Sequence, residues 1–152
     1  MAITGAKTDL FENLILNYVF KGEATFETGA ALYVGLVTGA ALTYVDEGAA
    51  TGPANWQDHE VAASRGYARQ TLGDSVFSAA ATAGTITNGA EINFGTSDHT
   101  DGWGSVTGFI ITTGSAIAST GTYYYGLFDI AKSVATGDSV RITASNLTIE
   151  ER

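Results

Sequence analysis

The chain has 152 residues, which suits a single domain with a core of ordinary size. It contains no cysteine, which excludes disulfide bonds, thiolate metal sites and cysteine nucleophiles. Its formal net charge of −9, from 7 basic and 16 acidic residues, opposes binding to nucleic acid and to anionic lipid surfaces.

The N-terminal part of the chain predicts an arm and then a helix. Residues 1–8 are small and polar, and we expect them to form a flexible arm. Asp9 and Glu12 have the spacing of a capping box, in which the Asp9 carboxylate accepts a hydrogen bond from the first turn. Apolar residues then recur at helical spacing up to Gly22, which can adopt the left-handed conformation that ends a helix. We therefore expect a helix over residues 9–21.

The apolar band of this helix is wide for a helix on a protein surface. Such a band either lies across a sheet or docks on another subunit. The residues that we expect to form an assembly interface are Leu10, Phe11, Leu14, Ile15 and Tyr18.

The sequence shows no signal for export or for a membrane span. No apolar run approaches the roughly 18–20 residues that a membrane helix needs. The N-terminus also lacks the basic, apolar and small-residue series of a signal peptide. We expect the chain to be made in a cytoplasm and to stay soluble.

The rest of the chain predicts short antiparallel strands. From Ala31 the apolar pattern has a period of two, so Leu32, Val34 and Leu36 share one face of a buried strand and the residues between them face the other side. Further strand signals occur at residues 66–72, 76–77, 85–87, 92–94, 103–111, 123–128, 137–142 and 147–149.

Turn chemistry between these segments predicts how they connect. Asn88-Gly89 suits the positive φ angles of a type I′ turn, so we expect residues 85–87 and 92–94 to form a hairpin. About seven or eight short strands after one helix are typical of a sandwich or jelly roll. The predicted fold is mainly β: an antiparallel β-sandwich, jelly-roll-like, with one N-terminal α-helix, in a single domain over residues 9–152.

Two aromatic features are open to two interpretations. The longest predicted loop, residues 46–64, contains Trp56, which either pins the loop to the core or contacts a partner. In the run Tyr123-Tyr124-Tyr125, alternate side chains face opposite sides of a strand. One side should be core, and the other either packs across strands or forms an exposed aromatic surface.

The two histidines have acidic neighbours but no recognisable site spacing. His59 lies between Asp58 and Glu60, and His99 lies between Asp98 and Thr100, so a shared cation site is conceivable if the loops meet. Aspartate, histidine and threonine are, however, ordinary turn residues. No Gly-x-Ser-x-Gly elbow or phosphate-binding glycine loop occurs. We predict no catalytic residue, no metal ligand and no cofactor.

Arg65 and Arg69 are two of only seven basic residues. Arg69 lies in the middle of a predicted strand. It either forms a weak surface ion pair or pairs with a carboxylate of a neighbouring chain.

The order of these segments resembles a family of small tailed-bacteriophage virion proteins of the tail-fibre-like and head-decoration kind. After the helix, the segments on which the resemblance rests are Ala31–Leu36, Gly66–Gln70, Ile92–Phe94, Trp103–Phe109, Tyr125–Leu127, Val134–Ile142 and Leu147–Ile149.

The resemblance implies a β-sandwich subunit that assembles into symmetric oligomers, often trimers. Its partners would be its own copies and a major capsid, neck or tail protein, in a virion made in the bacterial host cytoplasm. The first hypothesis is a non-enzymatic decoration or cement protein that binds the capsid through residues 1–21. The alternative is a neck- or tail-associated fibre adaptor or receptor-binding adhesin, using Trp56 or an exposed tyrosine face.

Overall fold

The computed structural model describes residues 3–7, 9–21, 32–38, 59–73, 76–77, 83–117 and 122–150. Within these ranges most of the regular structure is strand, and the one α-helix is N-terminal. This confirms the expected fold class. The elements are β1 (Ile3–Lys7), α1 (Asp9–Lys21), β2 (Leu32–Thr38), the 3-10 helix η2 (Ala63–Arg65), β3 (Gln70–Leu72), β4 (Thr85–Thr87), β5 (Ile92–Thr96), β6 (Gly104–Thr112), β7 (Thr122–Val134), β8 (Ser139–Ile142) and β9 (Thr148–Glu150).

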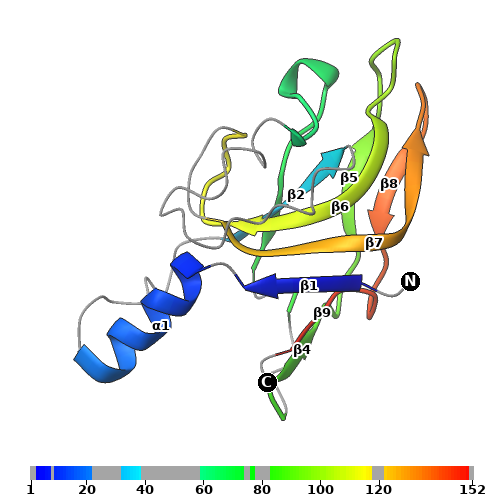
Figure 1. The fold of residues 1–152 in the computed structure, drawn as a ribbon. Helices are drawn as coiled ribbons and strands as arrows, with labels where there is room; N and C mark the ends of the chain where they lie inside the picture. The colour runs from blue at the N-terminus through cyan, green and yellow to red at the C-terminus, as the bar shows by residue number, and fades with distance from the viewer. Residues whose placement is uncertain are drawn as a thin grey trace.

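The described strands form one large sheet and two small ones, all antiparallel. The large sheet has five strands in the order β1-β7-β6-β2-β3. The small sheets are the pairs β4-β9 and β5-β8. Figure 1 shows the long, curved strands β6 and β7 side by side across the molecule, with α1 projecting at one corner.

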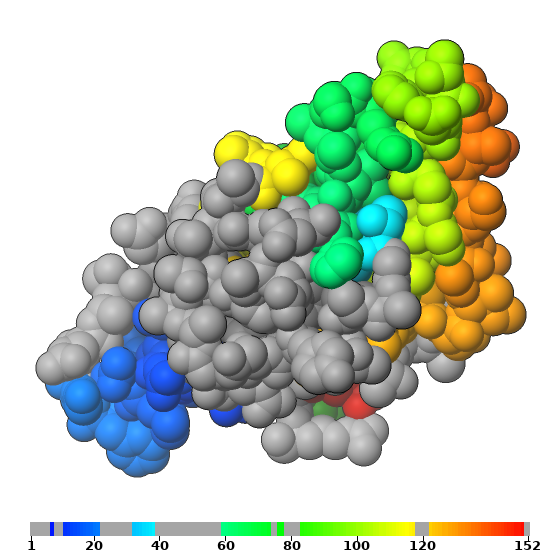
Figure 2. All heavy atoms as spheres, turned by 45° about the horizontal axis from the view of Figure 1, so that its top comes forward, coloured from blue at the N-terminus to red at the C-terminus, as the bar shows by residue number. Residues whose placement is uncertain are grey.

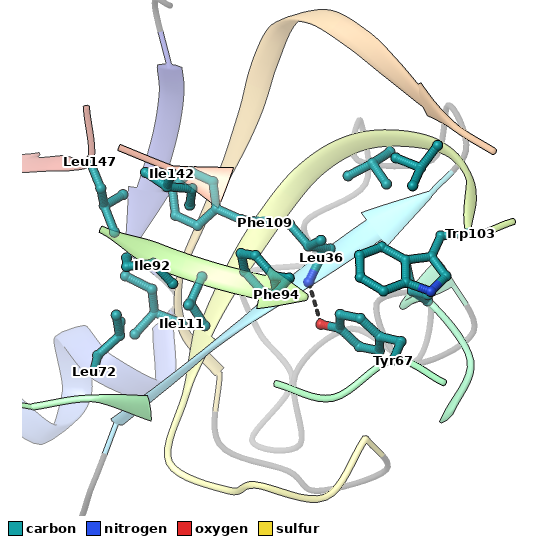
Figure 3. Close-up of a cluster of buried hydrophobic side chains, with 14 of the residues drawn as sticks. Leu36, Tyr67, Leu72, Ile92, Phe94, Trp103, Phe109, Ile111, Ile142 and Leu147 are labelled. Atoms are coloured by element: carbon teal, nitrogen blue, oxygen red, sulfur yellow. Dashed lines mark hydrogen bonds between the residues drawn. The ribbon is translucent and has the colours of Figure 1, made fainter. Parts of the chain in front are cut away.

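The main core lies between the large sheet and the small sheets. Val34 and Leu36 of β2 and Phe109 and Ile111 of β6 point into it from the large sheet. Figure 3 shows β5 crossing the same cluster from the other side. The residues that complete the cluster from the second layer are Ile92, Phe94, Ile142 and Leu147. Two facing layers with apolar inner faces give the sandwich-like arrangement.

The opposite face of the central strands is also buried. Val37 and Ile110 form a second cluster, against which Tyr125 and Leu127 pack. The predicted alternation in β2 is therefore confirmed, because Val34 and Val37 belong to clusters on opposite faces.

The expectation of a flexible arm does not hold for Ile3–Lys7, which form β1. This strand pairs antiparallel with β7, from Ile3 opposite Phe128 to Lys7 opposite Tyr124. A strand at a sheet edge can be held by main-chain hydrogen bonds alone, so small and polar residues give little signal of it.

The predicted hairpin at Asn88-Gly89 is wrong. The segment before it, β4, pairs with β9, and the segment after it, β5, pairs with β8. Gly89 does not adopt the positive φ that a type I′ turn needs. Asn88 is buried instead, and its side-chain amide donates to the carbonyl oxygens of Ala90 and Thr143 and accepts from the amide of Leu147. Asn88 thus joins the connection between β4 and β5 to the connection between β8 and β9.

Two other predicted elements differ from the structure. The expected strand over residues 66–72 is a strand only at Gln70–Leu72, and residues 76–77 lie in a turn and a bend. The predicted loop 46–64 ends in backbone pairing, because Glu60 forms a β-bridge with Val37. This pairing brings the Glu60 side chain over β2.

Candidate functional site

Helix α1 is joined to the body of the molecule by Phe11. The ring of Phe11 lies 4.7 Å from the ring of Tyr123 and 4.9 Å from that of Tyr124, measured between centroids. Both tyrosines lie near the start of β7, the strand against which α1 packs. Tyr124 and Tyr125 pack on different core clusters, so these two side chains of the tyrosine run serve the core.

The outward face of α1 is apolar and exposed to solvent. Leu16 is 52% exposed, Val19 60% and Phe20 79%. Their spacing of i, i+3 and i+4 places them on one side of the helix. Four of the five exposed large hydrophobic residues in the described ranges belong to α1, the fourth being Tyr18. We call Leu16, Val19 and Phe20 the outward face.

The sequence predicted an apolar helix but not which side would be exposed. Phe11, Leu14 and Ile15, named as assembly residues, are only partly exposed, and Phe11 packs on its own chain. Tyr18 is half exposed, and the side chain of Leu10 lies outside the described residues. The sequence does contain a sign of the outward face, since apolar residues occur all round the helix. When one side of such a helix packs on the sheet, apolar residues on the other side stay uncovered.

Glu60 and Arg69 form a buried ion pair. Arg69 Nε donates to Glu60 Oε1 at 2.8 Å and Arg69 Nη2 donates to Glu60 Oε2 at 2.7 Å. The two side chains are 1% and 0% exposed. Arg69 also donates to the carbonyl oxygens of Gly114 and Ile117 and, at 3.4 Å, to Thr112 Oγ1. Every N–H group of the guanidinium therefore has an acceptor.

Tyr67 extends this cluster to the backbone of β2. Its hydroxyl donates to Glu60 Oε1 at 3.3 Å and accepts from the amide of Leu36 at 2.6 Å, the contact drawn in Figure 3. Burial, and then the Glu60 carboxylate, raise the pKa of Tyr67 far above the usual range of a tyrosine. Gly35 leaves room for the cluster, since a Cβ there would lie 2.6 Å from Glu60 Oε1.

This cluster of Glu60, Tyr67 and Arg69 is a structural centre. It joins the bridge at Glu60, strand β2, the segment before β3 and the turn after β6. Both sequence interpretations of Arg69 were wrong, because its partner is a buried carboxylate of the same chain. The Tyr67 hydroxyl thus links the Glu60 carboxylate to the backbone of β2.

Three turns meet at the end of the sheet away from α1, as Figures 1 and 2 show. We call them the turn cluster: residues 63–66, 97–103 and 135–138. Arg65 Nη1 donates to the Gly102 carbonyl at 2.9 Å, and Trp103 Nε1 donates to the Arg65 carbonyl at 2.9 Å. Thr136 Oγ1 lies 2.7 Å from the carbonyl oxygen of His99. These bonds fix three connections to one another.

The histidines do not form a metal site within the described residues. His99 Nδ1 accepts from the Asp101 amide at 3.2 Å, an ordinary turn contact. The carbonyl of His59 accepts from Thr38 Oγ1. Across the described ranges no group of three or more histidine, aspartate or glutamate residues could hold a metal ion. Asp58 and the predicted contact residue Trp56 lie outside those ranges.

No helix in the described part of the chain is both long enough and apolar enough to cross a membrane.

Comparison with known proteins gives one family. No curated protein matches the chain. The family model described as podophage GP4 fiber I protein gp80 matches residues 6–150, a range that runs from β1 through α1 to β9. The match confirms the resemblance to virion proteins of tailed phages. The chain belongs to the podophage GP4 fiber I protein gp80 family.

Proposed function

We propose that this chain is a non-enzymatic structural subunit of a tailed-phage fibre or of the neck or tail region that holds one. It would act as a single domain over residues 9–152 to whose sheet β1 is added, in a symmetric oligomer, after synthesis in the host cytoplasm. The outward face of α1 is the observation on which this proposal rests. The family favours a fibre location over capsid decoration, the first hypothesis from the sequence.

An exposed apolar helix suits a permanently assembled subunit. Burying a Leu, Val or Phe side chain completely contributes about 1.5–3 kcal/mol relative to leaving it exposed. Each of the three side chains of the outward face is more than half exposed in the single chain. Much of this free energy of burial would therefore be gained only when a partner covers them. Permanent interfaces have apolar centres of this kind. The partners would be further copies of the chain and a neck or tail protein.

The buried charges support a structural role. The carboxylate of Glu60 accepts from both Arg69 and Tyr67 and has negligible exposure, so substrate has no access to it. Charged groups used in this way fix the relative positions of chain segments. No cofactor is needed for such a role.

A second candidate function is receptor contact through the turn cluster. The hydrogen bonds between its turns would present exposed polar side chains, among them Asp98 and Asp101, on a fixed frame. Binding of the purified protein to host cells, reduced by Asp98→Ala with Asp101→Ala, would support it. Undiminished binding of that variant would count against it.

The location can be tested by labelled electron microscopy of purified particles. A peptide tag on this chain, detected with gold-conjugated antibody, should lie at a fibre, the neck or the tail. Label spread over the capsid shell would contradict the fibre proposal and support decoration. A particle that lacks the label altogether would contradict both.

A further inference from the structure

We infer that the outward face of α1 packs against α1 of another copy of this chain. The inference rests on the proposed function and identifies the partner of the helix. It concerns Leu16, Val19 and Phe20, not the residues first expected to form the interface.

The shape of the outward face suits a helix as its partner. Its three side chains form a stripe of i, i+3 and i+4 positions, the pattern by which one helix packs into the groove of another. Asn13 and Glu12 are exposed one turn before Leu16 and continue the same side of the helix. The other side of α1 packs on β7, so the outward face points away from the chain's own sheet. Figures 1 and 2 show α1 at one corner of the molecule.

The charge of the chain favours self-contact at this face. Copies with a net charge of −9 repel one another, so a contact between them is favoured where carboxylates are few. Residues 13–20 of α1 contain no charged residue. Two copies can therefore meet along this segment without placing like charges opposite each other, provided that Glu12, one turn before Leu16 on the same side, lies at the edge of the contact.

The outward face can supply the centre of such a contact, with neighbouring surface as its rim. A stable interface buries about 800 Å² per partner, more than three side chains provide. Association should therefore depend on protein concentration in dilute solution. On a particle, where copies are held together, the same contact would be permanent.

Solution mass and cross-linking test the inference. The natural chain should have the mass of two or more chains by light scattering. The variant Leu16→Gln, Val19→Gln, Phe20→Gln should have the mass of one chain with an unchanged circular dichroism spectrum, because glutamine keeps good helix propensity. The control Ile130→Gln changes the one exposed large hydrophobic residue outside α1 in the described ranges and should remain oligomeric.

Because the chain has no cysteine, any disulfide between two copies must join the introduced cysteines, so it shows that this position lies at the contact. Asn13→Cys should form a disulfide-linked dimer on mild oxidation several-fold more than Ile130→Cys. A natural chain that stays a single chain up to high concentration would overturn the inference, as would equal cross-linking of the two variants. If that chain is a monomer while the triple variant still fails to enter particles, the self-contact is wrong and the proposed function stands.

Discussion

Glu60 and Arg69 are held together by two hydrogen bonds of 2.8 and 2.7 Å, with both side chains almost completely removed from solvent. Removal of one partner leaves an uncompensated buried charge, which costs about 3–5 kcal/mol. We expect Glu60→Gln to lower the free energy of unfolding by that amount in chemical denaturation. Glu91→Gln, at the exposed pair with Arg141, should change it by less than about 1 kcal/mol.

A double variant separates the pair from its other contacts. Glu60→Leu with Arg69→Met leaves no buried charge, so its loss should be smaller than the sum of the two single losses. Equal or greater loss in the double variant would show that the ion pair is not the main interaction of the cluster.

Because the pKa of the Tyr67 hydroxyl is raised, we expect the free energy of unfolding to fall at alkaline pH. Its pKa in the folded chain is raised, whereas in the unfolded chain tyrosine ionises near pH 10. Above about pH 10 the unfolded state loses this proton and the folded state keeps it, so unfolding becomes easier as pH rises. The free energy of unfolding should fall by up to about 1.4 kcal/mol more per pH unit in the natural chain than in Tyr67→Phe. Parallel pH profiles for the two proteins would contradict this assignment.

Position 35 in β2 leaves no room for a side chain larger than that of glycine. A Cβ there would lie 2.6 Å from Glu60 Oε1, 3.1 Å from Ile110 Cγ1 and 3.2 Å from the hydroxyl of Tyr67. We expect Gly35→Ala to lower the free energy of unfolding by about 1–3 kcal/mol, the usual cost of overpacking. Gly73→Ala is the matched control, since nothing lies within 4 Å of its Cβ position. Similar midpoints of thermal unfolding for the two variants would refute the steric role.

We expect replacement of Asn88 to destabilise the fold as replacement of a core residue does, although an Asn-Gly sequence predicts an exposed turn. Asn88→Ala removes three side-chain hydrogen bonds and takes the acceptor from the buried amide of Leu147, while the carbonyl groups of Ala90 and Thr143 are only partly buried. An unpaired buried group costs about 1–3 kcal/mol, so we expect a loss of that size in the free energy of unfolding. Asn146→Ala, which removes one exposed bond to Thr143, should have little effect in the same denaturation measurement.

Local patterns in the sequence predicted the elements whose signals are local. The helix over residues 9–21 has the predicted bounds, because the spacing of apolar residues is a signal that acts within a few residues. The faces of β2 followed from its alternation for the same reason. Strand β6 lies where residues 103–111 predicted a strand, whereas β7 covers the predicted segment 123–128 and runs on to Val134.

Features set by long-range contacts were missed. The partners of β4 and β5 are strands more than forty residues further along the chain, so a favourable turn dipeptide between β4 and β5 misled the hairpin prediction. Glu60 and Arg69 are separated by a segment whose one regular element is the short 3-10 helix η2, and no local rule joins them. The outward face of α1 depends on which side of the helix meets β7 through Phe11.

The copy number of this chain in purified particles tests the central claim most directly. A phage whose gene carries Leu16→Gln, Val19→Gln and Phe20→Gln should be compared with one carrying Ile130→Gln, by quantitative mass spectrometry of particles. The account predicts that the triple variant is nearly absent from particles while the Ile130→Gln protein is present at the natural level. Full incorporation of the triple variant would contradict assembly through the outward face.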